Sequence, residues 1–172
     1  PATYVERCVI NAIKHDITIY AAHTNMDVVA NGVSGRMADK LDLHHRQILQ
    51  PEGDPVDGNG FGIIGELQQP VESMAFLQQV KEIFRCDRLR YTTPHTSSIQ
   101  RVAVCGGAGA SFFKQALAGQ ADIYISGDFK YHDFFLTENR IMIADIGHYE
   151  SEQFTKEIFY EILTKKISKF AV

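Results

Sequence analysis

The chain has 172 residues, a formal net charge of −4 and 45% hydrophobic residues. This length suits one domain or two small lobes, and the apolar fraction supports a hydrophobic core and excludes a disordered or low-complexity chain. Acidic and basic residues are interspersed, which argues against a dedicated duplex-DNA-binding protein, because such proteins usually carry a basic stripe.

The first elements along the chain are a helix, a strand and a second short helix. Apolar residues at helical spacing predict a helix over 4–14, and the β-branched residues of 17–22 predict a buried strand. A loop over 23–34 follows, and then a short helix over 35–43. His44 and His45 come next, and we expect them to be surface residues.

A glycine- and proline-rich stretch then separates two parts of the sequence. Residues 50–62 contain two prolines and four glycines, a composition that does not favour a regular element. We therefore expect a first α/β lobe over 1–50, a linker over 51–62 and a second α/β lobe over 63–172.

Strands and helices alternate through the second part of the sequence. This alternation predicts an α/β fold with two lobes, in which mixed, mostly parallel sheets are flanked by helices. The expected strands are 61–67, 89–93, 101–105, 121–126 and 141–146, and the expected helices are 71–84, 112–118 and 151–167.

The most informative residues follow the last predicted strand. His148 and Glu152 stand four positions apart where an amphipathic pattern begins, and on a helix this spacing puts both on one face, roughly 5–6 Å apart at Cβ. An imidazole and a carboxylate so placed can ligate a metal ion. The alternative is a simple helix start with acidic residues in its first turn.

A second histidine and carboxylate follow the strand predicted over 17–22. Asp27 could bridge two cations, or Asn25 and Asp27 could simply cap turns. We assign His23 and Asn25 to supporting positions around the ligands, because metal-binding groups need hydrogen-bond partners that orient them. Ligand sites in open α/β sheets lie at the carboxyl ends of strands, where both segments fall.

Two further loops carry possible chemistry. Lys130 and His132 follow a strand and could act as general acid or base or bind an anion, or they could belong to an exposed polar loop. The glycines of 106–109 stand between a strand and a helix, where backbone N–H groups could bind phosphate, or where glycine permits close packing.

Three segments together resemble the motifs of the Nif-three-like (NGG-one-interacting-factor-three-like) family. They are His23-Thr-Asn-Met-Asp27, Gly127-Asp-Phe-Lys-Tyr-His132 and Asp145-Ile-Gly-His-Tyr-Glu-Ser-Glu152. The resemblance covers most of the chain. Many family members carry the name type 2 homologue of GTP cyclohydrolase I.

The resemblance implies a dinuclear site for divalent metal ions in a cleft between two α/β lobes. By motif match, Asp27, His148 and Glu152 would be ligands. The family takes further ligands from a paired-histidine motif that precedes the segment matching the start of this chain, so we expect a fragment without that motif. Long members also carry an inserted domain near 50–62. Nitrogen and oxygen ligands suit Zn, Mn, Fe, Ni or Co.

These observations lead to a metal-dependent hydrolase that acts on a nucleotide-like substrate, with opening of a purine ring by analogy. One alternative is a metal-stabilised regulatory or interaction protein linked to transcription or nucleic acid. Another is a nucleotide-binding phosphate loop without metal chemistry. The family resemblance also implies a homohexamer.

The three cysteines, Cys8, Cys86 and Cys105, form no CxxC pair. A disulfide framework is therefore not expected, and a reducing cytoplasm fits best. The sequence contains no signal peptide and no apolar run long enough to cross a membrane.

Overall fold

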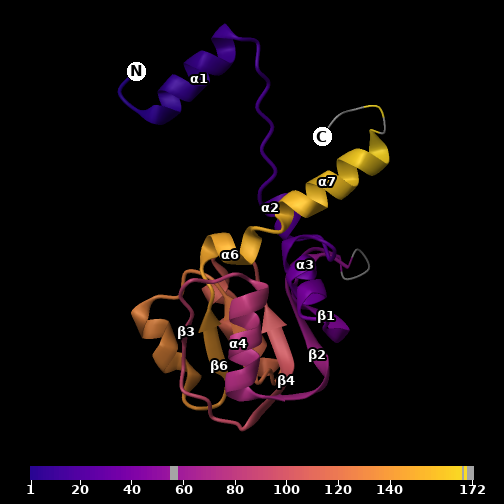
Figure 1. The fold of residues 1–172 in the computed structure, drawn as a ribbon, viewed down its shortest axis with the longest axis vertical. Coiled ribbons are helices and arrows are strands. Elements are labelled where there is room, and N and C mark those ends of the chain that lie inside the picture. The colour runs from indigo at the N-terminus through magenta and orange to yellow at the C-terminus, as the bar shows by residue number, and fades with distance from the viewer. Residues whose placement is uncertain (55–57, 168, 170–172) are drawn as a thin grey trace.

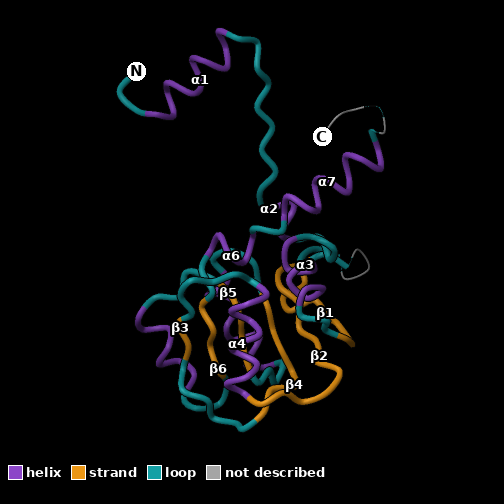
Figure 2. Tube along the Cα trace, in the orientation of Figure 1, coloured by secondary structure: helices purple, strands orange, loops and turns teal. Residues whose placement is uncertain are grey.

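A six-stranded mixed sheet forms the centre of the molecule in the computed structural model, which describes residues 1–54, 58–167 and 169. Figures 1 and 2 show the sheet with helices on both faces, while α1 stands away from it at the end of an extended segment. In the order in which they neighbour one another, the strands are β1 (His44–Pro51), β2 (Gly60–Glu72), β4 (Ser98–Val104), β5 (Ile123–Ser126), β6 (Met142–Asp145) and β3 (Arg90–Tyr91).

The helices fall between and around these strands. The α-helices are α1 (Tyr4–Lys14), α2 (Thr24–Asp27), α3 (Val33–Lys40), α4 (Ser73–Ile83), α5 (Phe113–Ala118), α6 (His148–Glu152) and α7 (Thr155–Lys166). Two 3-10 helices, η2 (Gly109–Phe112) and η3 (Tyr131–Thr137), complete the described elements. The predicted α/β class is confirmed.

Parallel pairing is confined to the centre of the sheet. Strands β4, β5 and β6 run parallel, whereas β1 with β2, β2 with β4 and β3 with β6 are antiparallel. The expectation of mostly parallel pairing therefore holds only for the central strands. Of the antiparallel pairs, only β1 and β2 are consecutive in the sequence, and close succession favours antiparallel pairing because parallel neighbours need a long crossover.

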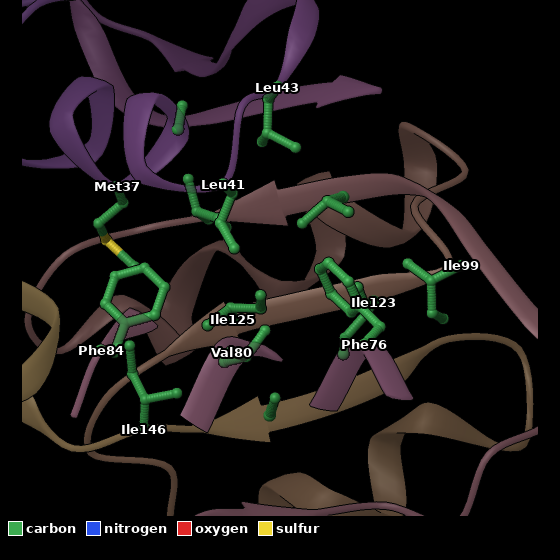
Figure 3. Close-up of a cluster of buried hydrophobic side chains, with 14 of the residues drawn as sticks. Met37, Leu41, Leu43, Phe76, Val80, Phe84, Ile99, Ile123, Ile125 and Ile146 are labelled. Carbon is green, nitrogen blue, oxygen red and sulfur yellow. The ribbon is translucent and has the colours of Figure 1, made fainter. Parts of the chain in front are cut away.

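The sheet is buried on both faces. Successive residues of the central strands point to opposite sides, so that Val102, Ile123 and Met142 pack against α3 and α4, while Ala103, Tyr124 and Ile143 pack against α5 and η3. Figure 3 shows the first of these cores, in which Met37 from α3 and Phe84 next to α4 meet Ile125 of the sheet.

One strand expected from the sequence is wrong. Residues 17–22 belong to no strand, and Ile17, Ile19 and Tyr20 are 59%, 68% and 78% exposed. The residue types favour a strand, but a strand needs a neighbour for its backbone groups, and the segment runs away from the described sheet (Figure 1). Conversely, the sequence did not indicate β1, whose first residues, His44 and His45, are exposed as expected.

The glycine- and proline-rich stretch separates β1 from β2. Its ends are more regular than expected, since Pro51 closes β1 and Gly60 opens β2, where the two residues pair. Residues 55–57 of the expected linker lie outside the described part of the chain. The division into two lobes stays a prediction.

The sequence showed no apolar run long enough to cross a membrane, and the lengths of the helices can be compared with this expectation. Over residues 1–54, 58–167 and 169, none of the helices is both long enough and apolar enough to span a bilayer.

Candidate metal centre

Three loops emerge side by side where the parallel strands end. The glycine turn follows β4, the loop at 127–130 follows β5, and the segment that leads into α6 follows β6. Ser126 pairs with Asp145 in the register of β5 and β6, so the loops after these strands leave the sheet at the same height. This edge is where α/β sheets usually hold ligands.

The glycine turn and α6 line a cavity of about 200 Å³ that also receives Asp27 from α2. The predicted ligands Asp27, His148 and Glu152 all line it, although they come from opposite ends of the chain. The other lining residues are His23, Thr24, Phe61, Cys105, Gly106, Gly107, Ala108 and Phe112. The rings of Phe61 and Phe112 stack with their centroids 5.1 Å apart and form an apolar wall.

His148 lies between two carboxylates. Its Nδ1 is 2.7 Å from Oδ2 of Asp128, and its Nε2 is 3.4 Å from Oε1 of Glu152. The helical spacing predicted for His148 and Glu152 is confirmed, because the two residues are the first and last of α6. The α6 backbone thus turns the imidazole and the carboxylate toward one cavity.

The pKa values of Asp27, Glu152 and His148 are all raised, although burial and neighbouring opposite charges act in opposite directions on each group. Burial raises the pKa of Asp27, and the nearby charges of His23 and His148 offset part of this shift. Burial also raises the pKa of Glu152, against the effect of His148. The hydrogen bond that His148 donates to Asp128 raises the pKa of His148, and burial opposes this shift. A cation placed among these groups would favour the deprotonated form of each.

The glycine turn does not offer its N–H groups to a ligand. The N–H groups of Gly106, Gly107 and Gly109 donate to the hydroxyls of Ser34, Ser151 and Ser126 at 3.2, 2.8 and 3.0 Å. A phosphate bound by these donors would have to displace all three hydroxyls. The phosphate-loop interpretation is therefore wrong for these three groups, and the close-packing interpretation holds.

Close approach is most acute at Gly107. Its φ of +63° is left-handed, and a Cβ there would lie 2.4 Å from Oε1 of Glu152 and 3.3 Å from Nε2 of His148. Only glycine therefore leaves room for both side chains above the turn.

The remaining predicted site residues are distributed around the cavity. His23 lines it, and its ring Nδ1 lies 3.0 Å from Oγ1 of Thr24. Asn25 accepts a hydrogen bond from the His23 N–H at 2.8 Å and so shapes the turn below. Lys130 and His132 are exposed and are not among the described residues that line the cavity. Their catalytic role stays a prediction.

Sequence reasoning missed two contributors. Asp128 lies in the motif over 127–132 without a predicted role, yet its carboxylate contacts His148. Ser151 is not among the predicted site residues either, yet it is buried and joins α6 to the glycine turn. The serine between two glutamates carried a usable signal, because adjacent helical residues lie about 100° apart, so that Ser151 can contact a neighbouring element while Glu152 faces the cavity.

The donor set suits a divalent cation, since it combines an imidazole nitrogen with carboxylate oxygens. Gly107 adds a second sign of fit, because it keeps the space beside Glu152 and His148 free of a side chain. Within the described ranges, no three histidine, cysteine, aspartate or glutamate side chains are grouped closely enough to hold one ion. His148 and Glu152 are in direct contact, with 3.4 Å between Nε2 and Oε1.

The fold and site thus define a layered α/β protein with imidazole and carboxylate groups gathered at the carboxyl edge of its parallel strands. The chain belongs to the Duf34/NIF3 (NGG1p interacting factor 3) family, whose model matches residues 2–172. The family resemblance predicted from the sequence motifs is confirmed.

Curated relatives carry one common name. The chain is 39% identical over 154 residues to the GTP cyclohydrolase 1 type 2 homolog of Streptococcus pneumoniae, covering 87% of this chain and 57% of the relative. It is 32% identical to the protein of the same name from Clostridium acetobutylicum, covering 87% of this chain and 56% of that relative. The chain therefore spans a little over half the length of these relatives.

Solved structures share the fold. The Staphylococcus aureus hypothetical protein SA1388 superposes with a TM-score of 0.87 at 23% identity, covering 100% of this chain and 69% of that chain. A Bacillus cereus protein related to NIF3 superposes with a TM-score of 0.80 at 21% identity, covering 93% and 71%.

Proposed function

We propose that the protein binds divalent metal ions through Asp27, His148 and Glu152 and uses them in a hydrolytic reaction. The observation that supports this proposal best is the convergence of the three side chains on one cavity of about 200 Å³. They come from two segments more than a hundred residues apart, and each belongs to a residue type that ligates Zn, Mn, Fe, Ni or Co.

Different residues of the site would have different roles in the proposed reaction. Asp27 and Glu152 would bind a cation through carboxylate oxygens, and His148 would bind it through Nε2. The stacked pair of Phe61 and Phe112 would limit the access of water. When bound, the cation would polarise an electrophile and make a water molecule more acidic. Lys130 or His132 would contact an anionic substrate or leaving group at the rim.

The substrate class rests on the relatives. Because the curated relatives are named GTP cyclohydrolase 1 type 2 homologs, we propose a purine nucleotide whose ring is opened. Likeness of fold alone does not define a substrate, so metal binding and ring opening need separate tests.

Metal analysis of the purified full-length protein tests the first part. We expect about two divalent ions per chain, as in two-metal hydrolases, and a clear loss in the His148→Ala and Asp27→Ala variants. Asp16→Ala is a matched control, because Asp16 is an exposed aspartate outside the cavity. Equal metal content in all four proteins would overturn the proposal.

Turnover tests the second part. We expect the metal-loaded protein to open the ring of a purine nucleotide, to lose this activity with a chelator, and to regain it when metal is restored. A protein that binds metal but turns over no purine nucleotide would contradict the enzymatic proposal and favour the regulatory alternative.

A further inference from the structure

We propose that Asp128 is a positioning residue that fixes the orientation and tautomer of His148, so that Nε2 and not Nδ1 is the atom offered to a cation. The inference rests on the proposed metal site and concerns a residue that lies in the motif over 127–132 but is not among the predicted site residues. It is carried by the contact between the two side chains and by the way in which the backbone holds them together.

The contact assigns the proton on the imidazole. A carboxylate can only accept a hydrogen bond, so the 2.7 Å contact with Oδ2 of Asp128 places a proton on Nδ1 of His148. In the neutral ring, Nε2 then carries the lone pair. This nitrogen is the one that lies 3.4 Å from Glu152 and above the glycine turn.

A second aspartate holds the two loops in place. Asp145 is only 4% exposed, and it accepts hydrogen bonds from the N–H of Phe129 at 3.2 Å and from the N–H of Gly147 at 3.0 Å. These amides belong to the residue after Asp128 and the residue before His148. One buried carboxylate therefore sets the spacing between the two side chains, and Arg90 forms an ion pair with its Oδ2.

The loop is also packed too tightly to slide. A Cβ at Gly127 would lie 2.8 Å from the backbone nitrogen of His148, so the loops touch through their backbones. Asp128 itself has a left-handed φ of +58°, a conformation that aspartate and asparagine tolerate better than most residues. These constraints direct the carboxylate toward the imidazole.

Orienting partners of this kind matter for affinity. A ligating histidine usually donates its other N–H to a carboxylate, and loss of that partner typically weakens metal binding 10- to 100-fold. Without Asp128, either ring nitrogen of His148 could carry the proton. Part of the population would then present an N–H group where a cation needs a lone pair.

The experiment combines two measurements on the full-length protein. The first is the zinc dissociation constant of the wild type and of the Asp128→Ala and Asp128→Asn variants. The second is the tautomer of His148 in the metal-free protein, read from the ring ¹⁵N resonances at about pH 9, above the usual histidine pKa of about 6.5. His148→Ala identifies which of the histidine signals belongs to His148.

We expect wild type to carry the proton on Nδ1 and Asp128→Ala to show a mixture of tautomers, with zinc affinity reduced about 10- to 100-fold. Asp128→Asn should retain most of the tautomer preference, because its amide oxygen still accepts a hydrogen bond and asparagine tolerates the backbone conformation. Asp16→Ala controls for the cost of placing alanine in a left-handed backbone conformation, since Asp16 also has a left-handed φ, of +52°.

The outcomes separate this inference from the proposed function. An unchanged tautomer in Asp128→Ala, or zinc affinities equal to those of wild type and Asp16→Ala, would overturn the role of Asp128 even if the site binds metal. Absence of zinc binding by wild type would overturn the proposed function, while the tautomer measurement would still decide the role of Asp128.

Discussion

The hydroxyl of Ser151 donates a hydrogen bond to the backbone carbonyl of His148 and accepts one from the N–H of Gly107, at 2.7 and 2.8 Å. This hydroxyl therefore ties the first turn of α6 to the glycine turn after β4. Each element lines the cavity on its own side, and the hydroxyl sets the gap between them.

Replacing Ser151 by alanine should destabilise the protein. The change leaves the buried N–H of Gly107 without its partner, which costs about 1–3 kcal/mol, and the loss should appear as a lower free energy of unfolding in urea. Thr164→Ala is the control, because its hydroxyl is exposed and bonds only to carbonyls of its own helix. Equal stabilities for the two variants would contradict the structural role of Ser151.

Gly107→Ala should impair both stability and metal binding. The left-handed backbone costs an alanine about 1–2 kcal/mol, and the added methyl must push Glu152 aside. Gly53→Ala separates these effects, since Gly53 has a φ of +74° with open space around its Cβ position. Calorimetric metal titration of both variants should show weaker binding only for Gly107→Ala, and an equal affinity would argue against the cavity as the metal site.

The cysteines should differ sharply in reactivity. Burial raises the pKa of both Cys86 and Cys105 to about 11, so these thiols stay protonated near neutral pH, and the thiolate is the reactive form. Cys8 is exposed. Iodoacetamide labelling followed by peptide mass spectrometry should modify Cys8 first, and fast labelling of Cys105 would show that its surroundings are more open than described.

The ionisation of His148 should make the free energy of unfolding of the metal-free protein depend on pH. The folded-state pKa of His148 is raised, chiefly by Asp128, so its stabilising contribution is fully present below the unfolded value of about 6.5 and is lost as the pH rises through the folded pKa. The difference in unfolding free energy between wild type and His148→Ala should therefore be larger at about pH 6 than at about pH 8.5.

The control for this pH dependence is His132→Ala, which removes an exposed histidine outside the cavity. Chemical denaturation in the presence of a chelator at both pH values provides the measurement. A difference for His148→Ala that stays constant with pH, or that grows as the pH rises, would contradict the assigned direction.

Local patterns in the sequence predicted the local parts of the site. The spacing of His148 and Glu152 determines a shared helix face directly, and α6 holds both residues, although the single helix expected over 151–167 is replaced by α6 and α7. Asp27 could be placed near them because ligand sites gather at the carboxyl ends of strands, although the strand predicted before it is not formed. Helix α4 was predicted within two residues at its start because its apolar period is strong.

The sequence could not predict the contacts that depend on the register between neighbouring strands. The meeting of Asp128 with His148 follows from the pairing of Ser126 with Asp145, and no sequence period encodes the relative height of two strands. The strand β1 was missed because its exposed edge carries polar residues that also suit a loop. Residues 17–22 show the opposite error, a strand that was predicted and is not formed. Their apolar side chains predict burial, which requires a neighbouring element.

Asp27 reaches the cavity from a short helix at the end of an exposed arm, and none of the side chains of α1 at the far end of that arm is buried. The 2.7 Å hydrogen bond from the N–H of Gly60 to the carbonyl of Val28 is one tether of this region to the sheet. A ligand bound between Asp27 and α6 would add a second tether. Binding of a ligand in the cavity and attachment of the arm to the sheet are then thermodynamically linked. The rate at which a protease cuts near residue 20 should therefore fall as the fraction of ligand-bound protein rises.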